Sequence, residues 1–322
     1  MTKELVSFVA TLLLVSVVST TAIAQSDTWS DRVQMVIDAT QPLKFDRGKR
    51  LPLYLWQARN PGHLTDKAAE EVVRLLNDRG IGLACSWNKG NVEDSVRDAA
   101  PIARAQRKLG LRHNVDATSC SYSFFNGDPK TAHIDKDGKT FFDPSLGGSN
   151  MGCAFGLEHR REPMRQQIKP FVDKYKELGL PLDFIWVDWE IDGPIEWNDS
   201  WSYAKRCVRC QNNIPDIDNF LAYQAALREI RSDLQRDCYA NTVLEAYPDV
   251  LVGNYAYYPN DGYRYWLDYF ERTVEGQPAL KDQRARYRHW YNEFPQTGYT
   301  YANPVLYTCL LYTSDAADEG LG

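Results

Sequence analysis

The stretch that decides the fold reads Leu182-Asp183-Phe184-Ile185-Trp186-Val187-Asp188-Trp189-Glu190-Ile191-Asp192-Gly193-Pro194. This apolar run becomes acidic towards its carboxyl end and stops at Gly-Pro, a pattern that predicts a buried strand opening into a loop. Because side chains alternate between the two faces of a strand, we expect Asp188, Glu190 and Asp192 to share one face. Three carboxylates are therefore predicted to lie in a row.

A row of carboxylates is costly in a folded protein. Like charges side by side raise the pKa of at least one carboxyl group, so the row indicates either a solvated strand end or a site that uses it. The flanking Trp and Ile side chains favour the second interpretation. A carboxyl group that holds its proton beside an ionised one is what glycoside hydrolysis requires. We therefore expect a glycoside hydrolase, with Glu190 as general acid/base and Asp188 as nucleophile or orienting carboxylate.

Around this stretch, predicted strands alternate with predicted helices. Apolar runs bounded by turn residues predict strands at 51–58, 81–87, 111–117 and 250–257, and a sixth opening at 298–307. Helical periodicity predicts helices at 64–79, 92–109, 162–178 and 217–246, the first capped by Thr65. Repeating units of this kind imply an α/β fold with parallel strands, either a (β/α)8 TIM-type barrel or an open doubly wound sheet. No Gly-x-Gly-x-x-Gly follows the first strand, and long insertions follow the third and fourth strands, where barrel enzymes place their active site, so we favour the barrel.

The number of strands predicts an incomplete domain. Only five or six of the eight strands of a barrel fit the chain, and Cys309 to Glu319 resembles translated sequencing adapter. We therefore expect a C-terminally truncated (β/α)8-type catalytic domain over 25–307 and a non-native tail over 308–322.

The amino terminus predicts export. An apolar run from Leu5 to Val18 precedes Ala22-Ile23-Ala24, which has the small-x-small pattern of a signal-peptidase site. Residues 1–24 are therefore predicted to be a signal peptide, and the mature protein to be secreted or periplasmic without membrane contact. A membrane-anchored amino terminus is the alternative.

Export permits disulfides, and the chain has seven cysteines. Cys207-Val-Arg-Cys210 is a single C-x-x-C, which is weak evidence for zinc or redox chemistry. We interpret it as a local disulfide, or as half of a pair with Cys153 or Cys238. The five His residues are scattered, so no metal and no cofactor are expected.

The composition restricts the class of partner. The net charge is −6 and no basic stripe is present, which argues against a nucleic-acid partner. The aromatic content of 12%, with 19 Tyr and 9 Trp, suits stacking on sugar rings. A polysaccharide is therefore the expected partner, and the oligomeric state is left open.

Residues near the carboxyl ends of the predicted strands complete the expected cleft, because these ends converge in a barrel. Asn and Asp can hold sugar hydroxyls there, and Trp can stack on a ring. Any single aromatic could instead be a core residue; the coincidence across several strands favours a cleft. The predicted substrate-binding residues are Asp192, Trp56, Trp87, Asn88, Asn114, Asp116, Asn254 and Tyr255.

The second catalytic carboxylate is less defined. Retaining enzymes hold the two carboxyl groups about 5–5.5 Å apart and inverting enzymes about 6.5–9.5 Å apart. Asp188 and Glu190 would have Cα atoms roughly 6.6 Å apart and could act as a pair. Glu245, Asp261 and Glu271 are further candidates, of which Glu245 is disfavoured because it ends a predicted helix, at the opposite face of a barrel.

Asp183-x-x-Trp186-x-Asp188-x-Glu190 resembles the fourth-strand signature Asp-x-x-Asp-x-Asp-x-Glu of glycoside hydrolase family 18, with Trp186 in place of the middle Asp. The resemblance implies that Glu190 is the general acid and that Asp188 orients an acetamido group of the substrate. Hydrolysis of N-acetylated glycans is therefore one alternative function.

Two longer segments, 187–197 and 250–266, are similar to exported marine polysaccharide hydrolases, among them the endo-fucanases of glycoside hydrolase family 168. This resemblance implies internal cleavage of sulfated fucan, which would require cations in the cleft. The cations at or near strand ends are Arg59, His63, Lys89, His113 and Arg264, each of which could instead be an ordinary surface or packing residue. A carbohydrate-binding protein that kept the aromatic cleft but lost catalysis is a further alternative.

Overall fold

The structure is a computed structural model that describes residues 27–55, 63–121, 127–144, 150–187, 200–254 and 294–301. The predicted signal peptide and the predicted tail both lie outside these residues. Among the helices of the described residues, none is long and apolar enough to cross a membrane.

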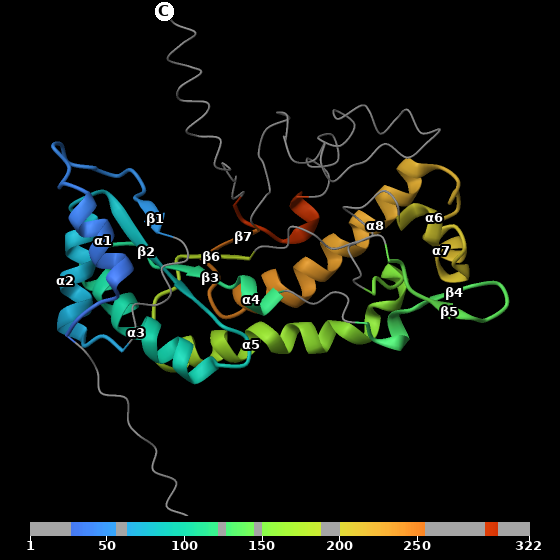
Figure 1. Cartoon of the computed structure of the whole chain (residues 1–322), viewed down its shortest axis with the longest axis horizontal. Coiled ribbons are helices and arrows are strands. Elements are labelled where there is room, and N and C mark those ends of the chain that lie inside the picture. The colour runs from blue at the N-terminus through green and yellow to red at the C-terminus, as the bar shows by residue number, and fades with distance from the viewer. Residues whose placement is uncertain are drawn as a thin grey trace, which may run out of the picture.

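A parallel sheet of five strands lies at the centre of the described residues (Figure 1). Its strands are β1 (Leu53–Leu55), β2 (Ile81–Ser86), β3 (Asn114–Asp116), β6 (Phe184–Val187) and β7 (Leu251–Asn254). Each strand pairs with the strand of this sheet that follows it along the chain, in the order β1-β2-β3-β6-β7. The prediction of an α/β fold with a parallel sheet is therefore confirmed, with shorter strands than the apolar runs suggest.

Helices connect consecutive strands, as the periodicity predicts. The connecting helices are α2 (Asp66–Asn77), α3 (Val92–Lys108), α5 (Arg161–Glu177) and α8 (Phe220–Gln235), and α1 (Asp31–Ala39) precedes β1. The expected cap of α2 is present, because the Thr65 hydroxyl accepts a hydrogen bond from the Ala68 N–H at 3.2 Å. The helix expected over 217–246 is present over 220–244, where α8 continues into the π-helical turn η5 (Arg236–Ala240) and then α9 (Asn241–Leu244).

Two insertions interrupt this alternation. The insertion after β3 contains α4 (Thr118–Ser121), η1 (Pro129–Thr131), the antiparallel pair β4 (His133–Ile134) and β5 (Thr140–Phe141), η2 (Ala154–Gly156) and η3 (Glu158–Arg160). The insertion after β6 contains α6 (Ser200–Ala204) and α7 (Val208–Asn213). Figure 1 shows β4, β5, α6 and α7 together at one end of the molecule, beyond the sheet.

The two faces of the sheet differ in their cover. Cys85, Val115, Ile185 and Val252 share one row of the register and are fully buried against the helices. The neighbouring row, one residue further along each strand, points to the opposite face and contains Ser86, Asp116, Trp186 and Gly253. Polar and aromatic side chains therefore lie on the face opposite the one that packs on α5.

The predicted sixth strand begins beside β7. The Thr300 N–H donates to the Val252 carbonyl at 2.9 Å, and the Val252 N–H donates to the Thr300 hydroxyl at 2.8 Å. Within the described part of the segment, 298–301, the chain follows β7 without forming a regular strand; η7 (Phe294–Thr297) precedes it.

Candidate functional site

A polar pair joins β3 and β6 on the face away from the helices. The Trp186 indole N–H donates to the Asn114 side-chain oxygen at 3.0 Å, and both side chains are nearly buried. Asp116, two residues beyond Asn114, is half-buried and accepts a hydrogen bond from the Thr118 N–H at 2.9 Å. Two of the predicted binding residues, Asn114 and Asp116, thus lie on the same face as Trp186.

The predicted catalytic residues follow directly on β6. The alternation expected there is observed as far as the structure describes it, with Ile185 and Val187 fully buried on the helix side and Trp186 on the other. Asp188, Glu190 and Asp192 lie outside the described residues, as do Trp56, Tyr255, Asp261 and Glu271. Their roles remain predictions from the sequence.

Trp87 is a core residue and does not line a cleft. It is fully buried, and its ring stacks on Phe171 of α5 with centroids 5.2 Å apart and meets Tyr175 edge-on at 4.9 Å. The reason is the strand period, because Trp87 follows Ser86 on the face of Cys85, which the helices cover. A sugar ring cannot stack on this indole in the folded chain.

The other two predicted binding residues that the structure describes are Asn254 and Asn88, and they lie in different surroundings. Asn254 is fully buried and pairs in register with Val187, which places it on the helix side of β7. Asn88 is exposed in the turn after β2, where its backbone N–H donates to the Ser95 hydroxyl at 3.1 Å. Of these two, only Asn88 is accessible to a ligand.

Two residues named in the sequence analysis, Asp183 and His113, connect the amino ends of neighbouring strands. Asp183 accepts hydrogen bonds from the Arg112 guanidinium and from the His113 N–H, both at 2.8 Å, and so ties the start of β6 to the start of β3. The His113 ring is fully buried between the Gln106 side chain (2.6 Å) and the Tyr175 hydroxyl (3.3 Å). Burial lowers the pKa of His113 to about 4, so it is a neutral packing residue and not a cation for sulfate.

The remaining charged candidates have ordinary surroundings. The His63 Nδ1 atom lies 3.0 Å from an Asp98 carboxylate oxygen, and Lys89 is exposed. Glu245 follows α9 and precedes β7, which puts it at the amino end of that strand, away from the carboxyl ends. Arg59 and Arg264 lie outside the described residues.

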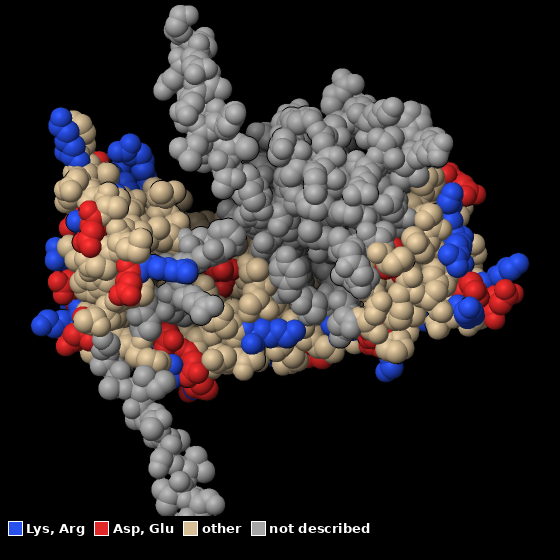
Figure 2. All heavy atoms as spheres, in the orientation of Figure 1, with Lys and Arg blue, Asp and Glu red and all other residues tan. Residues whose placement is uncertain are grey.

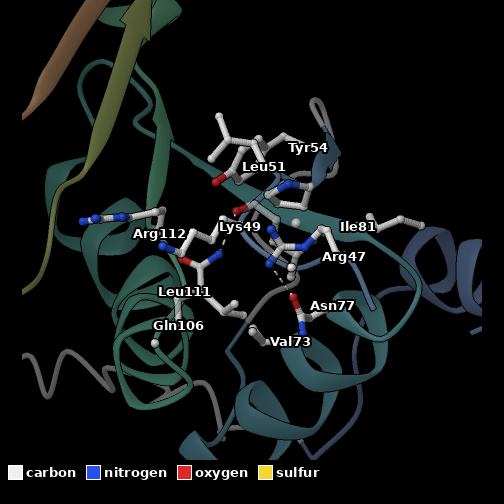
Figure 3. A pocket seen from close by; sticks show the side chains of 15 residues that line it. Arg47, Lys49, Leu51, Tyr54, Val73, Asn77, Ile81, Gln106, Leu111 and Arg112 are labelled. Atoms are coloured by element: carbon white, nitrogen blue, oxygen red, sulfur yellow. Dashed lines mark hydrogen bonds between the residues drawn. The ribbon is translucent and has the colours of Figure 1, made fainter. Parts of the chain in front are cut away.

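A cavity of about 420 Å³ opens near the amino ends of β1 and β2 (Figure 3). Arg47, Lys49 and Arg112 line it, but Arg47 donates to Asn77 at 3.2 Å and Arg112 is paired with Asp183. The cavity is far along the strands from the predicted catalytic end of β6. It therefore gives no support to a site at the carboxyl ends.

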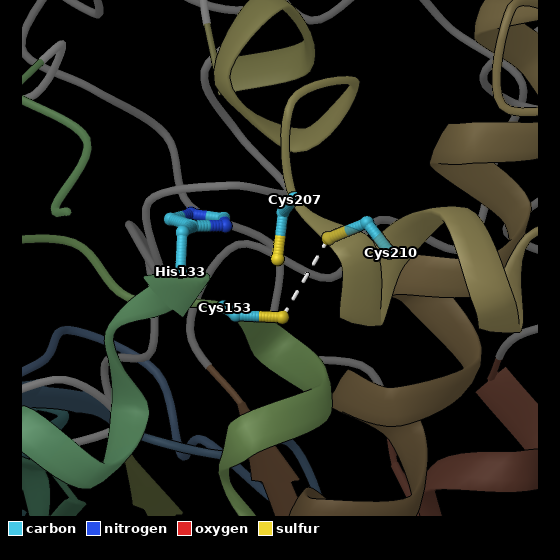
Figure 4. A group of neighbouring side chains, drawn as sticks. All are labelled: His133, Cys153, Cys207 and Cys210. Atoms are coloured by element: carbon cyan, nitrogen blue, oxygen red, sulfur yellow. Dashed lines mark hydrogen bonds between the residues drawn. The ribbon is translucent and has the colours of Figure 1, made fainter. Parts of the chain in front are cut away.

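A second group of reactive side chains lies in the insertions. His133, Cys153, Cys207 and Cys210 bring their ligand atoms within 4.8 Å of one another, and all four residues are buried (Figure 4). The Sγ atoms of Cys153 and Cys210 are 3.5 Å apart, and all six described cysteines are free thiols. The expected proximity of the C-x-x-C to Cys153 is therefore present, but these cysteines form no disulfide in the described residues. Cys238, the other expected partner, lies outside the group, on η5.

The three sulfur atoms of this group are in contact with one another. Contacts with Cys153 and Cys210 lower the pKa of Cys207, whereas contacts with Cys153 and Cys207 raise the pKa of Cys210. This group is not predictable from the C-x-x-C alone, because a single C-x-x-C does not indicate which distant residues join it. The sequence does contain the two further ligands, His133 and Cys153, both in the insertion after the third strand.

The described surface carries charges of both signs. Figure 2 shows Lys and Arg interspersed with Asp and Glu over the described residues of that face, in keeping with the many ion pairs between them. The chain as a whole matches no protein-family model and no curated protein.

Proposed function

We propose that this chain is an exported glycoside hydrolase with a (β/α)8-type barrel that cleaves a polysaccharide internally. The observation that carries the proposal is the sheet itself: parallel strands follow in chain order, and β6 leads from the Asn114–Trp186 pair directly into the acidic row. Glu190 would act as general acid/base, and Asp188 as nucleophile or orienting carboxylate.

The strand order favours a barrel over a doubly wound sheet. A doubly wound sheet reverses direction at a switch point and places helices on both faces, whereas a barrel adds each strand beside the last and keeps its helices outside. The described strands show no reversal, and Thr300 already occupies the free side of β7. Further strands could continue from that side.

The chemistry follows from the period of β6. If the alternation continues past Val187, the side chains of Asp188 and Glu190 emerge on the face of Trp186, beside Asn114 and Asp116. Glu190 would then protonate the glycosidic oxygen while the second carboxylate stabilises or attacks the developing oxocarbenium centre. Neutral polar groups such as the Asn114 amide can hold sugar hydroxyls there.

The substrate class rests on the resemblances. Similarity over 187–197 and 250–266 supports sulfated fucan as the first candidate, and the family 18-like motif supports N-acetylated glycans as the second. Both belong to the same reaction class, the hydrolysis of an O-glycosyl bond.

The test is a reducing-end release assay on sulfated fucan, chitin, hyaluronan and β-glucans with the full-length protein. We expect release from one polymer, and a decrease of about 10²–10⁴-fold for Glu190→Gln, since general acid/base catalysis contributes about that much. Glu93→Gln is the matched control, because the Glu93 side chain is 79% exposed on α3, and should keep the wild-type rate.

Turnover that is unchanged in a folded Glu190→Gln variant would refute the assignment of the acid. Binding of an oligosaccharide without turnover, equal in both proteins, would instead support a carbohydrate-binding protein.

A further inference from the structure

We infer that His133, Cys153, Cys207 and Cys210 form a structural zinc site of the Cys3His type. The inference rests on the geometry of the two insertions and is independent of the proposed hydrolase activity. No residue of the acidic row takes part in it.

The spacing of the four side chains fits one tetrahedral ion. Zn–S bonds of about 2.3 Å and Zn–N bonds of about 2.0 Å require ligand atoms roughly 3.5–3.8 Å from one another. The Cys153 and Cys210 sulfurs are 3.5 Å apart, and all four ligand atoms lie within 4.8 Å of one another. Small rotations of the side chains would bring the set to the coordination distances.

A disulfide would not account for the whole group. It would join two of the three sulfurs and leave a third buried thiol beside a buried imidazole. Neither ring nitrogen of His133 makes a regular hydrogen bond within the described residues, although the ring lies beside the Cys207 sulfur and stacks on Phe141 at 5.1 Å. Coordination would give one of these nitrogens a partner, and the three thiols would release their protons as the metal binds.

The backbone around the ligands is already fixed. Arg209, between the two cysteines of the C-x-x-C, donates Nη1 to the carbonyls of Lys130 (3.0 Å) and Ala132 (3.3 Å), just before His133. The Cys153 N–H donates to the Thr131 carbonyl at 2.6 Å. These contacts hold the three ligand-bearing segments together, as a preorganised site requires.

Backbone N–H groups also point at the sulfurs. The N–H of Ile134 donates to the Cys207 sulfur, and the N–H of Phe155 donates to the Cys153 sulfur. Contacts of this kind orient a ligand and belong to the outer shell of a metal site.

The expected role is structural. Four protein ligands close the coordination sphere of zinc and leave no position for water or substrate, unlike a catalytic site with three ligands. The ion would join β4 and the turn before η2, both in the insertion after β3, to α7 in the insertion after β6. Thiolate and imidazole ligands select a borderline-soft ion such as zinc over Mg²⁺ or Ca²⁺.

The experiment begins with the metal content of the full chain, purified without chelator and measured by plasma mass spectrometry. We expect about one zinc ion per chain, released in step with the titration of the thiols by a mercurial reagent. Replacement of zinc by Co²⁺ should give the visible absorption of a tetrahedral thiolate complex, a readout that needs no variant.

The variants Cys207→Ser and Cys153→Ser should lose the zinc. Cys238→Ser is the matched control, because Cys238 is equally buried on η5 outside the group, and it should retain about one ion. His133→Ala, which keeps all three thiolates, should release zinc to a competing chelator faster than the wild type does.

Two results would overturn the inference. One is a protein with less than about 0.1 zinc per chain whose intact mass, without reduction, shows a disulfide among Cys153, Cys207 and Cys210. The other is an unchanged zinc content in a folded Cys207→Ser variant. Inactivity on every polysaccharide would refute the hydrolase and leave the zinc result standing.

Discussion

His113 makes the stability of the protein depend on pH. Its pKa falls from 6.5 to about 4 on folding because burial disfavours the charged ring. Between these values the unfolded chain binds a proton that the folded chain does not, so this residue destabilises the fold progressively as the pH decreases from 6.5 towards 4. The shift corresponds to a loss of about 3 kcal/mol at most. We expect denaturant titrations at a series of pH values to show a smaller acid-side loss for His113→Gln than for the wild type.

The control for this prediction is Gln41→Ala. Gln41 is exposed and does not titrate, so its replacement should preserve the acid-side loss. If the wild type and His113→Gln lose stability in parallel, the neutral state assigned to His113 is wrong.

Single residues were the hardest scale to predict from the sequence. His113 looks like a functional candidate because it is polar and close to a strand end, and Asp183 opens the motif of the fourth strand, yet both join strands. Trp87 was predicted to line the cleft, but it points into the core. Successive residues of a strand point to opposite faces, so Trp87 lies on the face opposite Ser86. The sequence gives the period of a strand, whereas its phase depends on which side the helices pack.

At the scale of one element, the Thr65 cap should be measurable. The Thr65 hydroxyl accepts from the Ala68 N–H and also donates to the Asp27 carboxylate at 2.6 Å. We expect Thr65→Ala to lower the free energy of unfolding by about 1 kcal/mol, measured by denaturant titration. Thr65→Ser keeps the hydroxyl and should remain close to wild type; equal losses in both variants would show that the hydrogen bond is not the cause.

The helices and strands were predictable because their patterns are local. Buried Ala68, Val72 and Leu76 recur at the helical period, and a turn at Gly80 ends the unit before β2. The π-helical turn at η5 was not predicted, because such turns are rare and a single turn is too short to establish a period of its own. The hairpin β4–β5 is too short to give an alternating pattern, so the insertion was expected only as irregular chain.

At the scale of the molecule, the two insertions should depend on the ion. A ligand that binds only the folded state stabilises it by about 4 kcal/mol when it is present at about 1,000 times its dissociation constant. We expect a strong chelator to lower the midpoint of thermal unfolding by roughly 5–15 °C, followed by calorimetry, and added zinc to restore it.

The same treatment of Cys207→Ser provides the control and should leave its midpoint unchanged. Restoration of the wild type by Mg²⁺, or a midpoint insensitive to the chelator, would contradict a structural zinc ion.

The order of the sheet has a consequence for the way the chain is made. Since each strand of the sheet pairs with the strand of the same sheet that was synthesised before it, the sheet can grow strand by strand during synthesis. The four side chains of the proposed zinc site can come together only after β6 has been synthesised, because His133 and Cys153 precede β6 whereas Cys207 and Cys210 follow it. We therefore expect zinc binding to be a late step of folding, which fixes the two insertions after β6 has paired with β3.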